Sequence, residues 1–268
     1  MCDSPVVEGD AYCERCGHAL GAPTCASCGV AAVDAEGYCE RCGARQPTAR
    51  DHAEIVLDGG AAAVTDRGLR RARNEDAMAL LAHGDAVVTV VCDGVGSSPR
   101  ADQASAVAVE TAGAALARGM SSQEAFELAG KAVAALATSV DDAPACTYVA
   151  AVAEPGRITL SWAGDTRAYW LPEGVLLTED DAVPTGEITA WLGADSGEVS
   201  LHVRVLAPAA PGMLLVCSDG LWRYLDGYRF PATGTPLDMA REMLRHALAS
   251  GGQDNVTIVL IPLGETHG

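Results

Sequence analysis

The cysteines of this 268-residue chain gather near its N-terminus and recur at a fixed spacing. Seven of the ten precede residue 43, and four of these form two CxxC turns, Cys25-Ala-Ser-Cys28 and Cys39-Glu-Arg-Cys42, with ten residues between them. A glycine follows each turn and allows the tight backbone that brings two sulfurs toward one ion. We therefore predict a structural zinc site with four thiolates. Disulfides are disfavoured by the cytoplasmic setting that we expect for this chain. A redox CxxC is disfavoured because the spacing repeats and no βαβ pattern surrounds it.

A less complete copy of this pattern comes first. Cys13-Glu-Arg-Cys16 repeats the second turn 26 residues earlier, and Cys2 stands at the same offset from the other turn. The fourth cysteine of this copy would precede the first residue, so either the chain begins further upstream or another ligand such as His18 completes the site. Residues 1–46 resemble the double zinc ribbons of bacterial proteins, with one or two zinc ions. A segment this short cannot bury enough apolar surface to fold without metal or covalent crosslinks, so we expect it to serve docking rather than chemistry.

The charge balance excludes some classes of partner. Acidic residues outnumber basic ones 36 to 18, which gives a net charge of −18, whereas nucleic-acid binding requires clustered Lys and Arg. The uncharged stretch Val205–Ser218 has 14 residues and two prolines, whereas a membrane-spanning helix needs about 20 apolar residues. No basic segment followed by an apolar run marks a signal peptide. We expect a cytoplasmic protein that binds neither nucleic acid nor membrane.

Residues 47–54 lack periodicity and are predicted as a linker to one domain over residues 55–263. Short apolar, β-branched runs predict strands at 61–65, 86–92, 147–153, 158–162, 167–171, 199–206, 213–217 and 255–262. Helices are predicted at 101–118, at 121–140 with a Ser121/Glu124 capping box, and at 236–249. Strands cluster at both ends of the domain with helices between them, which favours an α+β sandwich over an alternating parallel sheet. Three single cysteines lie in apolar runs and are expected to be buried: Cys92, Cys146 and Cys217.

Aspartates stand at the ends of several apolar strands. Val-Val-Cys-Asp93-Gly, Val-Cys-Ser-Asp219-Gly and Trp-Ala-Gly-Asp165 each follow such a run, and Gly-Gly-Gln-Asp254 arrives by a loop. An isolated Asp-Gly is usually a turn. Several carboxylates gathered at the mouths of buried strands would repel one another and raise each other's pKa, so such a cluster normally holds a cation. Oxygen ligands select Mg²⁺ or Mn²⁺ over zinc.

The stretch Thr65-Asp-Arg-Gly-Leu-Arg-Arg-Ala-Arg-Asn-Glu-Asp76 resembles the opening motif of the metal-dependent protein phosphatases, the phosphatase 2C or PPM family. Four further motifs follow in the family's order: Val91–Gly96, Gly164–Tyr169, Cys217–Trp222 and Asp254–Thr257. The resemblance covers residues 55–263. It implies a four-layer αββα sandwich, in which two antiparallel sheets are flanked by helix pairs and the metals lie at one edge.

The resemblance also implies roles for individual residues. It assigns oxygen ligands for two Mn²⁺ or Mg²⁺ ions and for a weaker third: Asp93 as the bridge, the Gly94 carbonyl, Asp219, Asp254, and Asp165 for the third ion. Asp76 would hold metal-bound waters, and Arg71 would bind the phosphate through its guanidinium. Two such ions, roughly 3.5–4 Å apart, lower the pKa of a bridging water and clamp the in-line displacement at phosphorus.

The chain departs from the family pattern at three places. Val95 stands where eukaryotic relatives have a histidine, so water or another group must protonate the leaving alkoxide, and we name no general acid. Ser97-Ser-Pro-Arg100 replaces a glycine-rich stretch at the entrance to the cleft. The segment between residues 181 and 191 is shorter than the mobile flap that selects substrates in relatives.

We therefore expect a hydrolase of phosphoserine and phosphothreonine that uses a metal-activated hydroxide and opposes bacterial-type Ser/Thr kinases. Its partners would be phosphorylated proteins. The main alternative is a phosphatase-like scaffold that binds phosphorylated partners without turnover, and the intact set of aspartates disfavours it. A zinc-dependent redox sensor is a third interpretation, supported only by the cysteines.

Overall fold

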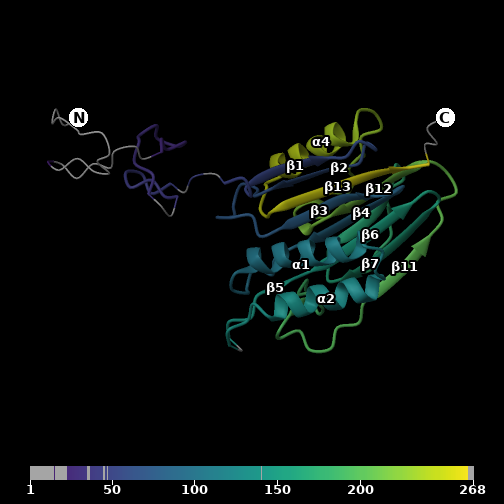
Figure 1. Ribbon diagram of the computed structural model, residues 1–268. Coiled ribbons are helices and arrows are strands. Elements are labelled where there is room, and N and C mark those ends of the chain that lie inside the picture. Colours follow the sequence, from purple (N-terminus) through teal and green to yellow (C-terminus); the bar gives the residue numbers. More distant parts are fainter. Residues whose placement is uncertain are drawn as a thin grey trace. The chain divides into compact units, whose positions relative to one another are not determined.

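The computed structural model describes Arg15 and residues 23–34, 37–44, 46, 48–139 and 141–264 (Figure 1). The chain divides into two compact units, Met1–Ala49 and Arg50–Gly268. In the smaller unit, isolated β-bridges join Thr24 to Ala31 and Val33 to Cys39. Its described core consists of four buried residues: Cys25, Ala32, Val33 and Cys39. So few apolar side chains cannot offset the entropy of ordering the segment, so it needs a crosslink or a metal.

The larger unit is built from two antiparallel sheets. The first has the order β1-β2-β13-β12-β8-β9, and the second has the order β11-β7-β6-β4-β3. A short pair, β10-β5, lies apart from both. The strands are β1 (His52–Val56), β2 (Ala62–Asp66), β3 (Ala77–His83), β4 (Ala86–Cys92), β5 (Ala145–Cys146), β6 (Tyr148–Glu154), β7 (Arg157–Ala163), β8 (Arg167–Leu171), β9 (Val175–Leu176), β10 (Leu192–Gly193), β11 (His202–Leu206), β12 (Gly212–Cys217) and β13 (Val256–Leu263).

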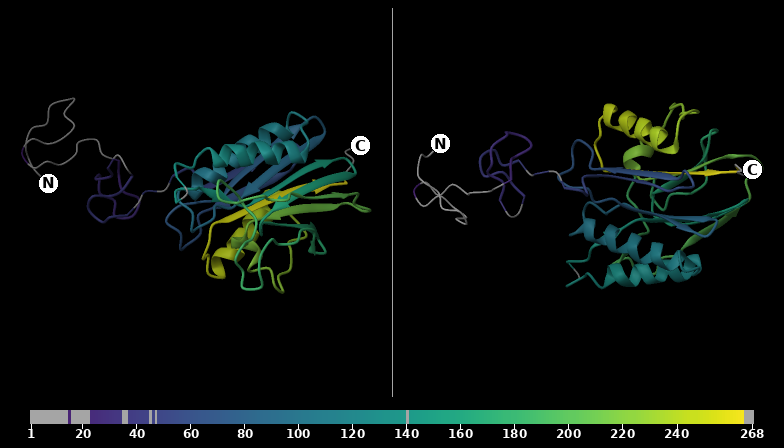
Figure 2. Two further views of the ribbon diagram at one scale, coloured as in Figure 1. Left: turned by 90° about the horizontal axis from the view of Figure 1, so that it is seen from below. Right: turned by 45° about the horizontal axis from the view of Figure 1, so that its top comes forward.

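Helices cover the outer face of each sheet (Figure 2). Helices α1 (Ala101–Leu116) and α2 (Ser122–Ala134) pack on the second sheet, and α3 (Asp219–Trp222) and α4 (Pro236–Ala249) pack on the first. Both α2 and α4 begin with a capping box, at Ser121 and at Thr235. Across the described residues, no helix is long and apolar enough to span a membrane.

The alternation of side chains along buried strands explains the four layers. In β4, Val90 and Cys92 face α1 and α2, whereas Val91 faces the other sheet. In β12, Leu214 points between the sheets and Leu215 points toward α4. Because successive side chains of a strand alternate between its faces, apolar runs without polar gaps fit strands buried on both sides. The αββα sandwich is confirmed, and its three apolar layers hold the sheets and helices together.

Most predicted elements are confirmed within a few residues, and two boundaries are wrong. Residues 52–54 of the predicted linker belong to β1, an edge strand whose alternating exposed side chains hide its apolar pattern. The predicted helix 121–140 ends at Ala134, because Arg100 binds the Leu136 carbonyl and Asp142 and so holds the following turn. Strand β3 was not predicted, because it follows the Asn-Glu-Asp loop without a turn signal. The three single cysteines are buried, as predicted.

The antiparallel register brings separate strand ends to one edge of the sandwich. Ala77 at the start of β3 pairs with Cys92 at the end of β4. In the other sheet, Val256 at the start of β13 pairs with Asp66 at the end of β2. Cys217, at the end of β12, pairs with Ile258 of β13. The residues next to these ends therefore meet, although Asp66 and Val256, for example, are 190 positions apart in the sequence.

One glycine at this edge allows a close approach of backbones. A Cβ added at Gly220 would collide with the backbone oxygen of Asn255, so Gly220→Ala should destabilise the fold by about 1–3 kcal/mol through overpacking. Gly59→Ala is the matched control, since among the described residues no heavy atom lies within 4 Å of a Cβ there. Urea unfolding of both variants measures the difference. Equal stabilities would mean that the Asp219 turn yields without strain.

Candidate metal centre and phosphate site

Five aspartates from separate elements surround one edge of the sandwich. Asp93 follows β4, Asp219 opens α3 after β12, Asp165 lies between β7 and β8, Asp76 precedes β3, and Asp254 precedes β13. Asp76, Asp165 and Asp219 are each more than nine-tenths buried. The structure thus brings together every aspartate that the sequence indicated.

Mutual repulsion dominates the electrostatics of this cluster. Loss of hydration and the charges of the other four aspartates raise the pKa of Asp93 well above its ordinary value. Burial raises the pKa of Asp76 to about 7, and the charge of Asp219 adds to that shift. Burial, followed by the charges of Asp219 and Asp180, raises the pKa of Asp165 to about 6. Full ionisation of the five aspartates is therefore unfavourable unless a cation offsets their charge.

Two carboxylate oxygens of the cluster lack a donor. Within the described part of the chain, Asp76 Oδ1 and Asp219 Oδ1 are buried and accept no hydrogen bond. The other oxygen of Asp76 accepts bonds from Ser218 Oγ and Thr257 Oγ1, both at 2.7 Å, which fixes the orientation of the carboxylate. The other oxygen of Asp219 contacts Arg223 at 2.6 Å. Buried anionic oxygens without donors fit hard divalent cations, so this donor set suits Mg²⁺ or Mn²⁺.

Gly94 is held where its backbone lines the cluster. Its N–H donates to the Glu75 carbonyl at 3.2 Å, and a β-bridge joins it to Cys146. A Cβ at this position would lie 2.8 Å from both the Ala101 side chain and the Glu75 oxygen. A larger residue would therefore push apart the backbone that follows Asp93.

Arg71 is the arginine of its loop that reaches the cluster. Its Nη2 lies 2.6 Å from Asp254 Oδ2, and this bond raises the pKa of the guanidinium. A Cβ at Gly96 would lie 3.2 Å from Arg71 Nη1, so this glycine leaves room for the guanidinium. Among its neighbours, Arg73 turns toward Asp102 at 3.7 Å and Arg70 is exposed. With 39% of its side chain exposed, Arg71 can meet a ligand from solvent.

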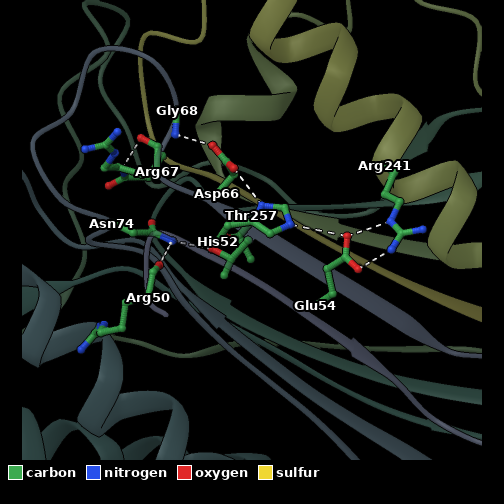
Figure 3. A network of polar contacts seen from close by, with 11 residues as sticks. Arg50, His52, Glu54, Asp66, Arg67, Gly68, Asn74, Arg241 and Thr257 are labelled. Atoms are coloured by element: carbon green, nitrogen blue, oxygen red, sulfur yellow. Dashed lines mark hydrogen bonds and ion pairs between the residues drawn. The ribbon is translucent and has the colours of Figure 1, made fainter. Parts of the chain in front are cut away.

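Two asparagines position the loop that carries Arg71 and Asp76. The Asn255 side chain accepts from the Glu75 N–H at 2.8 Å and donates to the carbonyls of Arg67 and Arg73. Asn74 donates to Thr65 Oγ1 and to the Arg50 carbonyl, both at 2.9 Å (Figure 3). Both asparagines stand within the sequence motifs described above, and those motifs alone indicate neither role. Their amides close contacts between distant segments, which a local pattern does not reveal.

A charged chain continues outward from the same loop (Figure 3). The Gly68 N–H donates to Asp66 at 2.8 Å, and the other oxygen of Asp66 contacts His52 Nδ1 at 2.8 Å. Glu54 lies 3.5 Å from His52 Nε2 and makes a two-pronged ion pair with Arg241 of α4. The edge strand β1 therefore ties the start of the loop to α4.

The four cysteines of the two CxxC turns form a separate cluster in the smaller unit. All four sulfurs lie within 4.8 Å of one another, with Cys25 to Cys42 and Cys28 to Cys39 at 3.7 Å. The Cys28 and Ser27 backbone N–H groups and the Gln46 side chain lower the pKa of the Cys25 thiol to about 6. Four unpaired thiols at this spacing fit a tetrahedral zinc ion.

Gln46 connects the segments that carry the two CxxC turns. No local sequence pattern indicated this role. Its Nε2 donates to Cys25 Sγ at 3.3 Å and to the Ala44 carbonyl at 2.9 Å. Its Oε1 accepts from the Ala26 N–H at 2.7 Å. The remaining predicted ligands of this region lie outside the described residues: Cys2, Cys13, Cys16 and His18.

Comparison with known proteins agrees with this arrangement. A family profile described as protein phosphatase 2C matches residues 69–254. The serine/threonine protein phosphatase PstP of Mycobacterium tuberculosis is 29% identical over 245 residues, which cover 78% of this chain and 46% of PstP. The serine/threonine phosphatase stp of Listeria innocua is 28% identical, over 74% of this chain and 93% of that protein. The chain thus matches about half the length of PstP and nearly all of stp.

A solved structure supports the fold. The catalytic domain of PstP in complex with two manganese ions superposes with a TM-score of 0.62 at 26% identity, covering 79% of this chain and all of that domain. The family profile spans well over half of the sequence and contains all five clustered aspartates, the last of them, Asp254, at its final residue. This chain belongs to the protein phosphatase 2C family.

Proposed function

We propose that this protein is a metal-dependent phosphatase that hydrolyses phosphoserine and phosphothreonine in proteins. The observation that carries the proposal is the aspartate cluster with its two buried oxygens that lack a donor, next to an arginine that reaches solvent. The names of the relatives, PstP and stp, agree with this reaction. We further propose that its substrates are phosphorylated by bacterial-type Ser/Thr kinases. We also propose that the protein lies in the cytoplasm, whose reducing conditions fit the free thiols of the smaller unit.

In this proposal, Asp93, Asp219, Asp254 and the Gly94 carbonyl hold two Mn²⁺ or Mg²⁺ ions, and Asp165 serves a third. When bound, these ions supply the positive charge that activates water and stabilises the phosphoryl group in the transition state. Asp76, fixed by Ser218 and Thr257, orients water at the cluster. Because the ions would neutralise the carboxylates, Arg71 could leave Asp254 and bind the phosphate instead.

Arg71 would bind phosphate in the ground and transition states alike. Its planar guanidinium offers paired N–H donors that match two phosphate oxygens, and Gly96 leaves space beside it. No side chain is assigned as the acid for the leaving group, because Val95 follows Gly94 and carries no proton to donate.

A scaffold that only binds phosphorylated partners is the second candidate. It would need the arginine but not the carboxylates. Buried aspartates with pKa values of about 6 and 7 oppose folding at neutral pH unless a cation neutralises them. A scaffold would gain nothing from these destabilising aspartates, so their presence favours the enzyme over the scaffold.

Hydrolysis of p-nitrophenyl phosphate with Mn²⁺ tests the proposal. We expect turnover that EDTA abolishes, and a loss of at least a hundredfold in kcat for Asp93→Asn, because the proposed bridging ligand is removed. Exposed Glu110→Gln should keep full activity as a control for the lost charge. Turnover of wild-type magnitude in Asp93→Asn with Mn²⁺ would contradict the assignment, and an inactive wild type would support the scaffold.

The same variant reports on the cluster without metal. Asp76 and Asp165 have pKa values raised above the ordinary value near 3.9, so the native state binds protons more tightly than the unfolded one. Their contribution to stability is therefore present at about pH 4 and is lost as the pH rises toward 7. In EDTA at pH 8, Asp93→Asn should exceed the wild type in stability, by on the order of 1–2 kcal/mol. A lower melting temperature would show that Asp93 is needed for folding.

Substitution of Arg71 separates binding from chemistry. Arg71→Ala should raise KM for a phosphopeptide more than it lowers kcat, with a loss of roughly 1.5–3 kcal/mol in kcat/KM. Arg70→Ala in the same loop is the control, since Arg70 is exposed and points to no partner among the described contacts. If KM stays unchanged in Arg71→Ala, another group binds the phosphate.

For the smaller unit, we propose one structural zinc ion on Cys25, Cys28, Cys39 and Cys42, with a second on Cys2, Cys13 and Cys16, and a docking role. Gln46 would stabilise the first ion by donating to the Cys25 thiolate and by joining the two turns. Gln46→Leu should therefore release its zinc to a colorimetric chelator about 10–100 times more readily.

Metal analysis accompanies this measurement. Cys42→Ser should lower the zinc content of the purified protein by one ion per chain, and exposed Glu40→Gln should change neither the content nor the release. If the purified wild-type protein contains no zinc, the proposal that this cluster binds zinc is wrong. Release from Gln46→Leu at the wild-type rate would leave the ion in place and refute only the role of Gln46.

A further inference from the structure

A hollow opens directly beside the aspartate cluster. It encloses about 430 Å³, and Val95, Ser98, Ala143 and Ala145 form much of its floor. Val95 is two residues beyond Asp93, so their Cα atoms are at most ~7.6 Å apart. A peptide whose phosphorylated side chain reaches the aspartates can therefore also reach this hollow within a few residues.

Hydrogen bonds fix the floor of the hollow. The Val95 N–H donates to the Ala145 carbonyl at 3.0 Å, and the Ala145 N–H donates to Ser98 Oγ at 3.1 Å. Ser98 Oγ in turn donates to the Val95 carbonyl at 2.9 Å. Ala145 belongs to β5, which pairs with β10, and Trp191 immediately precedes β10, so this pair carries the wall at Trp191. The floor and this wall are thus preformed.

The hollow carries negative charge without a matching cation. Among its lining residues, all of which the structure describes, Asp141, Glu187 and Asp195 are acidic and none is Lys or Arg. Two arginines lie close by, and both are paired with other groups. Arg100 binds the Leu136 carbonyl and Asp142, and Arg71, next to Gly96, binds Asp254. Asp195 accepts a bond from Trp191 Nε1 at 3.0 Å, which keeps the indole beside the carboxylates.

A second hollow near the cluster differs in its charge. It is lined by Asp165, Asp180, Arg167, Arg223 and Trp222, among others. Its arginines are neutralised there, since Arg167 pairs with Asp180 and Arg223 pairs with Asp219. The surface around the reaction centre is therefore polarised, with uncompensated negative charge on the Trp191 side.

We propose that the Trp191 hollow binds a Lys or Arg side chain of the substrate, placed within a few residues of the phosphorylated one. This inference rests on the proposed function and adds its substrate class, a phosphoprotein with a basic residue near the phosphorylated site. The aliphatic stem of the cation lies against Trp191, Val95 and Ala143, and its charged head meets the three carboxylates. Arg71 and this hollow thus select opposite charges at adjacent positions of one peptide.

Matched phosphothreonine peptides test the inference. Each peptide carries either Arg or Gln at one position, two to four residues before or after the phosphothreonine. We expect the wild type to favour the Arg peptide of at least one arm by roughly 5- to 50-fold in kcat/KM, with the preference reduced in 0.5 M NaCl. The triple variant Asp141→Asn/Glu187→Gln/Asp195→Asn keeps the hydrogen-bond acceptors and should lose this preference.

The control removes the same number of charges elsewhere. Asp85→Asn/Glu110→Gln/Glu127→Gln lies on exposed positions away from the hollow and should keep the preference. All three proteins should hydrolyse p-nitrophenyl phosphate equally, since that compound has no peptide flank. Equal rates on Arg and Gln peptides in the wild type would overturn the inference, as would an unchanged preference in the Asp141 triple variant.

Peptide binding separates this inference from the proposed function. Fluorescence anisotropy in EDTA, which prevents metal-dependent turnover, measures the preference for the wild type and for the Asp141 triple variant. If p-nitrophenyl phosphate is not hydrolysed but the Arg peptide still binds more tightly than the Gln peptide, the phosphatase proposal fails and the cation site stands. If hydrolysis proceeds without any preference in rate or binding, the phosphatase stands and the cation site fails.

Discussion

Crowding of carboxylates is the constraint on which the rest of this structure depends. Five aspartates meet at one edge of the sandwich, and the charges of the others oppose the ionisation of Asp93. A flexible protein would relieve this repulsion by moving the side chains apart. The αββα sandwich prevents that, because each aspartate lies within two residues of a strand end. The strands next to four of them, β4, β7, β12 and β13, are largely buried between the layers. The packed layers thus supply the rigidity, and the repulsion supplies the affinity for cations.

A polar chain inside the cluster fixes the geometry that repulsion alone would disturb. Asn74 donates to Thr65, the Thr65 hydroxyl bonds to that of Thr257, and Thr257 donates to Asp76. Asn255 holds the backbone of the adjoining loop at three points. These neutral donors orient the Asp76 carboxylate without placing a positive charge against it. Basic residues in these positions would have weakened the site.

The sequence predicted what repeats locally and missed what forms between distant segments. The ranges of β4, β8 and α4 were predicted in full, because apolar runs, a proline at the first helical turn and a capping threonine are all local signals. The ordered Asp motifs predicted the composition of the cluster. The roles of Asn255 and Gln46 could not be predicted, since each acts through contacts made across the fold. The hollow beside Trp191 could not be predicted either, because its three acidic residues come from separate loops.

The two units use opposite donor sets, and this keeps their chemistries apart. Thiolates in the smaller unit favour zinc, whereas the carboxylates and carbonyl of the larger unit favour Mn²⁺ or Mg²⁺. Zinc prefers sulfur and imidazole ligands, which the five aspartates do not supply, and manganese binds four thiolates less tightly than zinc does. The larger unit has three apolar layers to hold its fold. The smaller one has four buried apolar or sulfur side chains in its described core, so its fold needs a crosslink or a metal in addition to this packing.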